Sequence, residues 1–173
     1  MNDTLITVVS IFLASVLMLV FPLVNLSSKV DNISGTNVEE LTSDFVNTIK
    51  TTGEITSEEY DSYINQLGAT GNTYDVSMEV KKIGENPGKK TLQSAKDKIG
   101  ENYYISDYTS QIVSELEDKG VYKLNQGDIV SVTAKNTNVT LGQKMRNFLY
   151  SLVGSNTYKL STTQSGMVTA TQN

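Results

Sequence analysis

Residues 5–26, with the sequence LITVVSIFLASVLMLVFPLVNL, decide the architecture of this 173-residue chain. No charged residue lies between Asp3 and Lys29. At about 1.5 Å of rise per residue, the 22 residues make a helix of roughly 33 Å, and the hydrocarbon core of a bilayer is about 30 Å thick. The segment therefore predicts one membrane-spanning helix, followed by a water-soluble domain.

Two other interpretations of this segment are open. A cleaved signal peptide usually has a basic region before a shorter apolar core, and small residues at its cleavage site. Here Asp3 precedes the core and NLSSKV follows it. A buried helix of a soluble protein is usually apolar on one face, whereas this run is apolar on every face. An uncleaved single-span anchor within residues 1–30 is therefore the favoured interpretation.

The apolar side chains of the segment are the candidate functional residues, both as membrane anchor and as assembly surface. Pro22 removes one helical hydrogen bond, which predicts a kink near residues 18–22. Thr7, Ser10 and Ser15 can donate their hydroxyls to carbonyls one turn back, so lipid tolerates them. The candidate residues are Leu5, Ile6, Val8, Val9, Ile11, Phe12, Leu13, Val16, Leu17, Leu19, Val20, Phe21, Pro22, Leu23, Val24 and Leu26.

The charges that flank the segment do not define its orientation. The N-terminal flank has no Lys or Arg, and Lys29 is the nearest basic residue on the other side. This one lysine favours a cytoplasmic C-terminal domain by the positive-inside rule. A short N-terminal tail is also easily retained inside while a large domain is exported. Charge alone therefore leaves both orientations open.

Residues 31–173 are long enough for one domain. The net charge of −5, without a basic stripe, disfavours a nucleic-acid partner. The chain has no cysteine, which excludes disulfides, thiolate metal sites and cysteine nucleophiles. It also has no histidine, the commonest general base and zinc ligand. The composition predicts a protein that is not an enzyme, without a cofactor, metal or small-molecule substrate.

A polar stretch at residues 29–35 predicts a break between the apolar segment and the first helix of the soluble domain. Thr36 and Glu39 match a T-x-x-E capping box, and Gly53 is expected to end that helix after Lys50. The expected buried stripe of this helix is Val38, Leu41, Phe45, Val46 and Ile49.

A second capping box, Thr56 with Glu59, predicts another helix that ends at Gly68. The TGE sequence at residues 52–54 is expected to form a tight corner between the two helices, which together make a stalk over residues 36–68. The apolar face of the second helix is Tyr60, Tyr63, Ile64 and Leu67.

Alternating apolar and polar residues predict the strands of a head over residues 72–173. Residues 74–81 and 129–135 alternate clearly, and each has a glycine-containing turn nearby. A last strand is expected to begin at residues 158–162. Residues 167–171 would either extend this strand or form the second strand of a hairpin with it.

Two more helices are expected in the head. Ser106 or Asp107 would begin one that ends at Gly120, and a third capping box predicts another over residues 140–154. Residues 91–102 are ambiguous. The order helix, helix, strand, helix, strand, helix, strand or hairpin predicts an α+β fold with a mostly antiparallel sheet packed against helices.

The motifs that could carry chemistry have structural explanations. GENPGKK at residues 84–90 lacks the spacing of a phosphate loop and is typical of a turn. Asp61, Asp75 and Asp128 lack calcium-loop spacing. The carboxylates of Glu39, Glu40, Glu58, Glu59 and residues 115–118 are expected to cap helices or to lie on solvated faces.

An aromatic cluster contains Tyr103, Tyr104, Ile105 and Tyr108. It could form a surface for a carbohydrate or a protein partner. The simpler interpretation is that some of these rings cover the sheet while their hydroxyls reach water.

The apolar segment, EELTSDFVNTIKTTGEITSEEYDSYINQLGATGNTYDV at residues 39–76, GENPGKK and NQGDIVSVTAKNTN at residues 125–138 together resemble a family. It comprises pilin-like envelope proteins of Gram-positive, clostridial-type bacteria, similar to minor pseudopilins of the tight-adherence, type IV-like pilus. The resemblance implies a single extracytoplasmic domain over residues 31–173. It also implies a structural role in a surface filament or secretion apparatus, with the helix contacting other pilin-like subunits.

Pilin precursors carry a glycine before the apolar segment and a glutamate at the fifth mature position, and residues 1–26 contain neither. A part in the assembly platform is therefore open beside a filament subunit. The alternative outside this family is a single-span, membrane-anchored binding, adhesion or sensor protein.

Overall fold

The computed structural model describes residues 2–83, 104–139, 144, 147 and 161–171. The chain divides into two compact units, Met1–Thr36 with Asn138–Lys159, and Asn37–Thr137 with Leu160–Asn173. The described part of the first unit is mainly the N-terminal part of helix α1 (Asn2–Thr52). The second unit, called the head below, holds the last part of α1 and all the other labelled elements.

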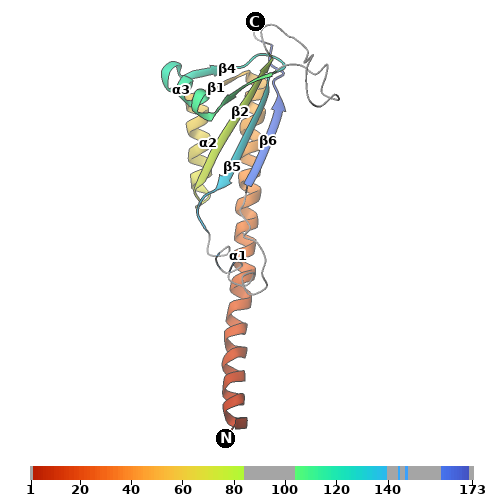
Figure 1. Ribbon diagram of the computed structural model, residues 1–173, viewed down its shortest axis with the longest axis vertical. Coiled ribbons are helices and arrows are strands. Elements are labelled where there is room, and N and C mark those ends of the chain that lie inside the picture. The colour runs from red at the N-terminus through yellow and green to blue at the C-terminus, as the bar shows by residue number, and fades with distance from the viewer. Residues whose placement is uncertain (1, 84–103, 140–143, 145–146, 148–160, 172–173) are drawn as a thin grey trace, which may run out of the picture. The chain divides into compact units, whose positions relative to one another are not determined.

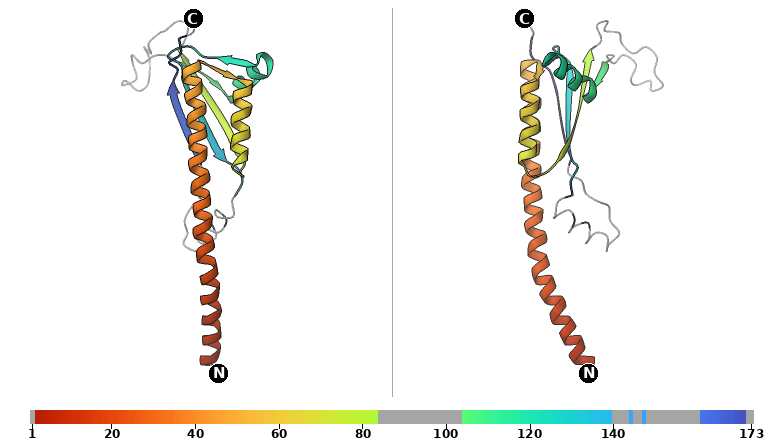
Figure 2. Two further views of the ribbon diagram at one scale, coloured as in Figure 1. Left: turned by 180° about the vertical axis from the view of Figure 1, so that it is seen from behind. Right: turned by 90° about the vertical axis from the view of Figure 1, so that its left-hand side faces the viewer.

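Helix α1 is continuous, so the break expected at residues 29–35 is wrong. Thr36 is not an N-cap. Its hydroxyl donates to the carbonyl of Asn32 at 3.1 Å, one turn back within the helix. The polar stretch contains no proline, so it changes the helix surface without interrupting the backbone hydrogen bonds. The helix also continues through Pro22, and the right-hand view of Figure 2 shows a curve in this half.

In the head, α1 is followed by helix α2 (Ser57–Ala69) after Gly53, whose φ of 76° ends α1. The predicted capping box of α2 is confirmed. Its Thr56 hydroxyl accepts from the Glu59 backbone N–H at 3.2 Å, and the Glu59 carboxylate accepts from the Thr56 N–H at 3.1 Å. The α1 segment and α2 lie side by side on one face of the sheet (Figures 1 and 2).

The main sheet has four antiparallel strands in the order β3-β2-β5-β6. They are β2 (Tyr74–Ile83), β3 (Tyr104–Tyr108), β5 (Ile129–Asn136) and β6 (Ser161–Met167). The predicted strands at residues 74–81 and 129–135 are therefore confirmed. The last strand, β6, includes Gly166 and ends at Met167. The described residues after Met167 neither extend β6 nor form a second strand of a hairpin with it.

A second, two-stranded sheet was not foreseen. It pairs β1 (Glu54–Thr56) with β4 (Val121–Lys123), so the expected corner at residues 52–54 leads directly into a strand. Helix α3 (Thr109–Lys119) ends at Gly120 as predicted, with φ of 74°. Its predicted start at residue 106 or 107 is wrong, since both residues belong to β3 and pair with β2.

One hydrophobic core lies between the sheet and the helices, which confirms the α+β class. Ile49 of α1, Ile112 of α3 and Val130 of β5 are completely buried. Further core residues are Val38, Phe45, Val46, Ile55, Tyr63, Leu67, Met78, Val80, Leu116, Tyr122, Leu124, Val132, Ala134 and Val168. All five positions of the stripe predicted for α1 contribute, with Leu41 packed against the core from its partly buried position.

Two sets of hydrogen bonds connect distant segments of the head. The Lys50 carbonyl, near the end of α1, accepts the backbone N–H groups of Thr169 at 2.9 Å and Ala170 at 3.2 Å. The Asp128 side chain is 1% exposed. Its carboxylate accepts the N–H groups of Ile83 at 3.1 Å and Asn125 at 2.8 Å, which joins the end of β2 to the turn before β5.

Several predictions lie outside the described residues. They are the turn at residues 84–90, the ambiguous residues 91–102, the start of the last strand at residues 158–160 and almost all of the helix at residues 140–154.

Candidate functional site

The N-terminal part of α1 carries the residues that the sequence predicts as functional. Among its exposed large hydrophobic residues, the exposed fraction of the side chain runs from 39% for Val16 to 80% for Met18. Val20 is half-buried, and the side chain of Val24 lies outside the described residues. The other predicted residues are exposed, namely Leu5, Ile6, Val8, Val9, Ile11, Phe12, Leu13, Leu17, Leu19, Phe21, Pro22, Leu23 and Leu26.

The stretch Asp3–Leu23 is 21 residues long, has a mean hydropathy of 2.6 and has no buried share. By length and composition it is able to span a membrane. A signal sequence near the N-terminus meets the same two criteria. Its hydroxyl groups are partly satisfied within the helix, because Thr7 donates to the Asp3 carbonyl and Ser15 to the Ile11 carbonyl, both at 2.8 Å.

Three small residues in the first half of this stretch share one face. Thr7, Ser10 and Ala14 follow one another at spacings of three and four, whereas Phe12 and Leu19 point to the opposite side. Small side chains allow two membrane helices to approach closely. Over residues 7–14 the helix therefore has a face of small side chains that suits close packing, opposite a face of large apolar side chains.

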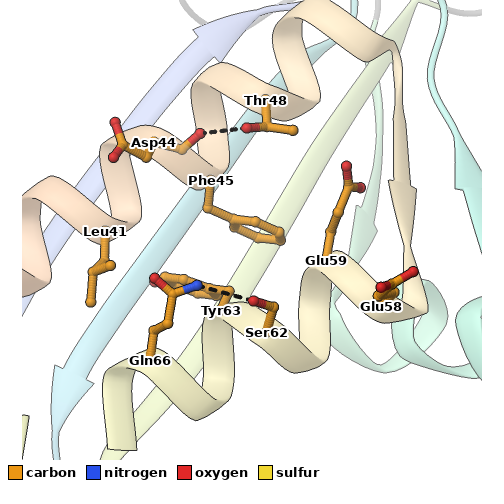
Figure 3. Close-up of a pocket in the computed structure, with 9 residues that line it drawn as sticks. All are labelled: Leu41, Asp44, Phe45, Thr48, Glu58, Glu59, Ser62, Tyr63 and Gln66. Carbon is orange, nitrogen blue, oxygen red and sulfur yellow. Dashed lines mark hydrogen bonds between the residues drawn. The ribbon is translucent and has the colours of Figure 1, made fainter. Parts of the chain in front are cut away.

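A groove of about 350 Å³ lies between α1 and α2 in the head (Figure 3). The rings of Phe45 and Tyr63 stack at its base, with centroids 4.4 Å apart and an interplanar angle of 6°. The Tyr63 hydroxyl lies 2.9 Å from the hydroxyl of buried Thr42. The groove is lined by Leu41, Asp44, Phe45, Thr48, Glu58, Glu59, Ser62, Tyr63 and Gln66. These contacts join the two helices.

The predicted roles of the carboxylates are only partly confirmed. Glu59 caps α2, but Glu39 lies inside α1 and caps nothing. Asp128, which the sequence did not distinguish, is buried and holds two backbone N–H groups. Within the described ranges, no three acidic, histidine or cysteine residues are placed to hold a metal ion.

A polar network that sequence reasoning missed joins β2, β3 and β4. The hydroxyl of Tyr122 donates to the Asp107 carboxylate at 2.7 Å, and Lys82 Nζ lies 3.0 Å from the same oxygen. The ammonium of Lys82 also lies 4.5 Å from the centre of the Tyr122 ring. Burial raises the pKa of Tyr122, and its hydrogen bond to Asp107 raises it further.

The pKa of Asp107 is shifted in the opposite direction from the pKa of Tyr122. Burial by itself would raise its pKa, but the hydrogen bonds from Tyr122 and Lys82, with the Lys82 charge, lower the pKa below the usual value of 3.8. A lowered pKa in the folded state stabilises the fold above the unfolded-state value, and this stabilisation is lost as the pH falls through the folded-state value.

Asp107→Asn tests this coupling. At neutral pH the variant is expected to be less stable than wild type by about 1–2 kcal/mol, and the difference should shrink as Asp107 protonates in wild type. Urea unfolding of the full-length protein in detergent, from about pH 6 to about pH 3, measures it. Tyrosine fluorescence reports the transition, since the chain has nine Tyr and no Trp. Exposed Asp75→Asn is the control, and a constant difference between wild type and Asp107→Asn over this range would contradict the assignment.

Among the described residues of the predicted aromatic cluster, Tyr104 and Tyr108 have positions on the same face of β3, whereas Ile105 lies on the other face. Tyr104 is half-buried, Ile105 is 52% exposed and Tyr108 is 58% exposed. Ile105 alternates with Tyr104 along β3, so the two side chains lie on opposite faces of the strand. Tyr103 lies outside the described residues.

No family model, curated relative or solved structure matches this chain. The geometry of the molecule itself therefore carries the functional argument.

Proposed function

We propose that the protein is a structural, pilin-like subunit of a cell-surface filament or of a secretion or assembly apparatus. The observation that supports this is the stretch Asp3–Leu23, which is 21 residues long, has no charged residue after Asp3 and has no buried share. Such a helix is stable either in lipid or against other apolar helices. In this proposal it anchors the chain in the membrane first and then packs against the helices of other subunits.

The proposal places the head outside the cytoplasm and gives it no catalytic role. The absence of His and Cys from the chain supports a non-enzymatic function. The small-residue face of Thr7, Ser10 and Ala14 supports helix association, because close backbone approach strengthens packing where no hydrophobic effect drives it. A monomeric anchor does not require such a face.

Disulfide cross-linking tests the assembly, since the chain has no native cysteine to interfere. In the double variant Phe12→Cys/Ala14→Cys, the two cysteines point to opposite sides of the helix. If each helix contacts neighbours on both sides, mild oxidation in cells should give a ladder of multimers. The matched variant Ser10→Cys/Ala14→Cys places both cysteines on one face and should stop mainly at dimers.

A fractionation and a protease-accessibility experiment complete the test. The protein should appear in filaments sheared from the cell surface or in a large detergent-resistant assembly, and protease added to intact cells should digest the head. A chain that gives no ladder and remains in the membrane fraction as a monomer would contradict the proposal.

A second candidate function is a membrane-anchored binding protein, in which the helix only tethers the head. A hollow of about 410 Å³ beside Tyr74 in the head favours this candidate. It predicts a monomeric helix together with a head that binds a ligand.

A further inference from the structure

Exposed apolar side chains on α1 continue past the stretch that is able to span a membrane. Between Ser27 and Thr36 the only large apolar residues are Val30 and Ile33. Together with Leu26 before them, they are between 54% and 62% exposed. Removing such side chains from water is favourable. Three of them on an otherwise polar part of the helix therefore indicate a surface that suits a partner.

The three residues belong to a strict seven-residue repeat. Val30 lies four positions after Leu26, and Ile33 lies three positions after Val30. The same alternation of four and three runs back to the start of the helix, and all the side chains on it are apolar and exposed. These residues, called the seam below, are Leu5, Val9, Phe12, Val16, Leu19, Leu23, Leu26, Val30 and Ile33.

The informative part of the seam is the part outside Asp3–Leu23. Inside that stretch almost every residue is apolar, so any repeat would fall mainly on apolar positions. Between Ser27 and Thr36 the composition is polar, and the two apolar residues fall on the positions that the repeat requires. The seam therefore extends beyond the segment whose composition lipid alone explains.

A strict seven-residue repeat is the pattern of a helix that pairs with another helix. An α-helix has about 3.6 residues per turn, so a stripe spaced at 3.5 stays in contact with a partner only if both helices supercoil. With Val30 at position a of the heptad, Val fills three of the four a positions of the seam and Leu fills three of the five d positions. Val at a with Leu at d favours two parallel strands, which indicates a second copy of the same helix.

The seam ends where the head begins. The next three positions of the repeat are Asn37, Glu40 and Asp44, so two copies in contact there would bring like charges together. The seam also lies opposite the face of Thr7, Ser10 and Ala14, because Phe12 and Leu19 belong to it. The pairing surface is therefore restricted to residues 5–33, and the small-residue face remains available for other contacts.

We propose that the seam pairs α1 with the α1 of a second copy in a parallel, two-stranded coiled coil that continues past the membrane to Ile33. This rests on the proposed membrane anchor, because two helices inserted in one membrane from the same end run in the same direction. The hydrophobic effect is absent between helices in lipid but acts on side chains exposed to water. Leu26, Val30 and Ile33 therefore decide whether the pair forms.

Single cysteines in the full-length protein test the pair, and the probe is mild oxidation of isolated membranes. Leu26→Cys, Val30→Cys and Ile33→Cys should each give a disulfide-linked dimer, because each cysteine faces its counterpart across the seam. The matched controls are Asn25→Cys and Asn32→Cys, at exposed positions that point away from the seam, and they should remain monomers. Equal dimer formation at all five positions, or none at the three seam positions, would overturn the proposal.

A charge placed in the seam provides a second measurement. Val30→Cys/Ile33→Asp should weaken pairing by roughly tenfold or more, because two carboxylates would have to lose water at the contact. Val30→Cys/Asn32→Asp adds the same charge on the other side of the helix and should dimerise as Val30→Cys does. Both changes lie before the head, so urea unfolding of the head should be the same in the two variants. Dimer formation unaffected by Ile33→Asp would refute the seam.

The two proposals for α1 fail in different experiments. Monomeric Val30→Cys together with dimers of Ser10→Cys/Ala14→Cys would overturn the seam and leave the filament subunit standing. Seam dimers without a ladder of multimers from Phe12→Cys/Ala14→Cys would support the coiled coil and contradict the filament.

Discussion

Leu13→Lys/Val16→Lys is expected to release the protein from membranes. Each lysine at the centre of a spanning helix costs about 2.5–3.5 kcal/mol, so the pair costs roughly 5–7 kcal/mol. The remaining apolar residues of the segment contribute about 0.3–0.6 kcal/mol each, and their sum is of similar size. Both positions are exposed, so the fold of the head should not change. Alkaline carbonate extraction should move the variant from the membrane pellet to the supernatant.

The matched control keeps the two charges and changes their place. Asn32→Lys/Ile33→Lys adds two lysines at exposed positions of the same helix, outside Asp3–Leu23. This variant should stay in the pellet as wild type does. If Leu13→Lys/Val16→Lys also stayed there, the apolar stretch would not be the anchor.

Asp128→Ala is expected to cause the largest loss of stability among single changes to polar residues of the head. The substitution leaves two backbone N–H groups, of Ile83 and Asn125, without their carboxylate acceptor in a buried place. Hydrogen bonds to charged groups contribute about 1.5–3 kcal/mol each, so we expect the two bonds together to contribute roughly 3–6 kcal/mol. Urea unfolding followed by tyrosine fluorescence measures it.

Two further variants separate this effect from a general loss of charge. Asp128→Asn keeps one acceptor oxygen and should fall between wild type and Asp128→Ala. Asp75→Ala removes an exposed carboxylate from β2 and should change the stability by less than about 0.5 kcal/mol. Equal losses for Asp128→Ala and Asp75→Ala would refute the structural role of Asp128.

Local signals predicted the elements that depend on local interactions. The capping box of Thr56 and Glu59 works within four residues, and the alternation of β2 and β5 follows directly from which side chains are buried. Elements set by distant partners were missed. Ser106 and Asp107 suit a helix start, but pairing with β2 and the contact of Asp107 with Tyr122 hold them in a strand. The strands β1 and β4 are three residues each, too short for a periodic pattern.

The same distinction applies to the candidate sites. The apolar stretch of α1 was predictable because composition alone defines it. The burial of Asn136 was not predictable, since Asn136 in isolation resembles any polar residue at the end of a strand. That burial, and the lack of a described hydrogen-bond partner, follow only from the pairing of β2 with β5 inside the folded head.

The contact between Lys50 and Thr169 joins residues 119 positions apart. Since β6 and this contact lie after every other element of the head, the ribosome must synthesise the chain as far as Thr169 before the head can complete its fold. The apolar stretch of α1, by contrast, is synthesised before the head, and by length and composition it is able to enter a membrane while the head is still being synthesised. In the proposed role, in which the head is exported, a translocation channel would therefore meet the head as an unfolded chain, which is the form that such a channel can pass.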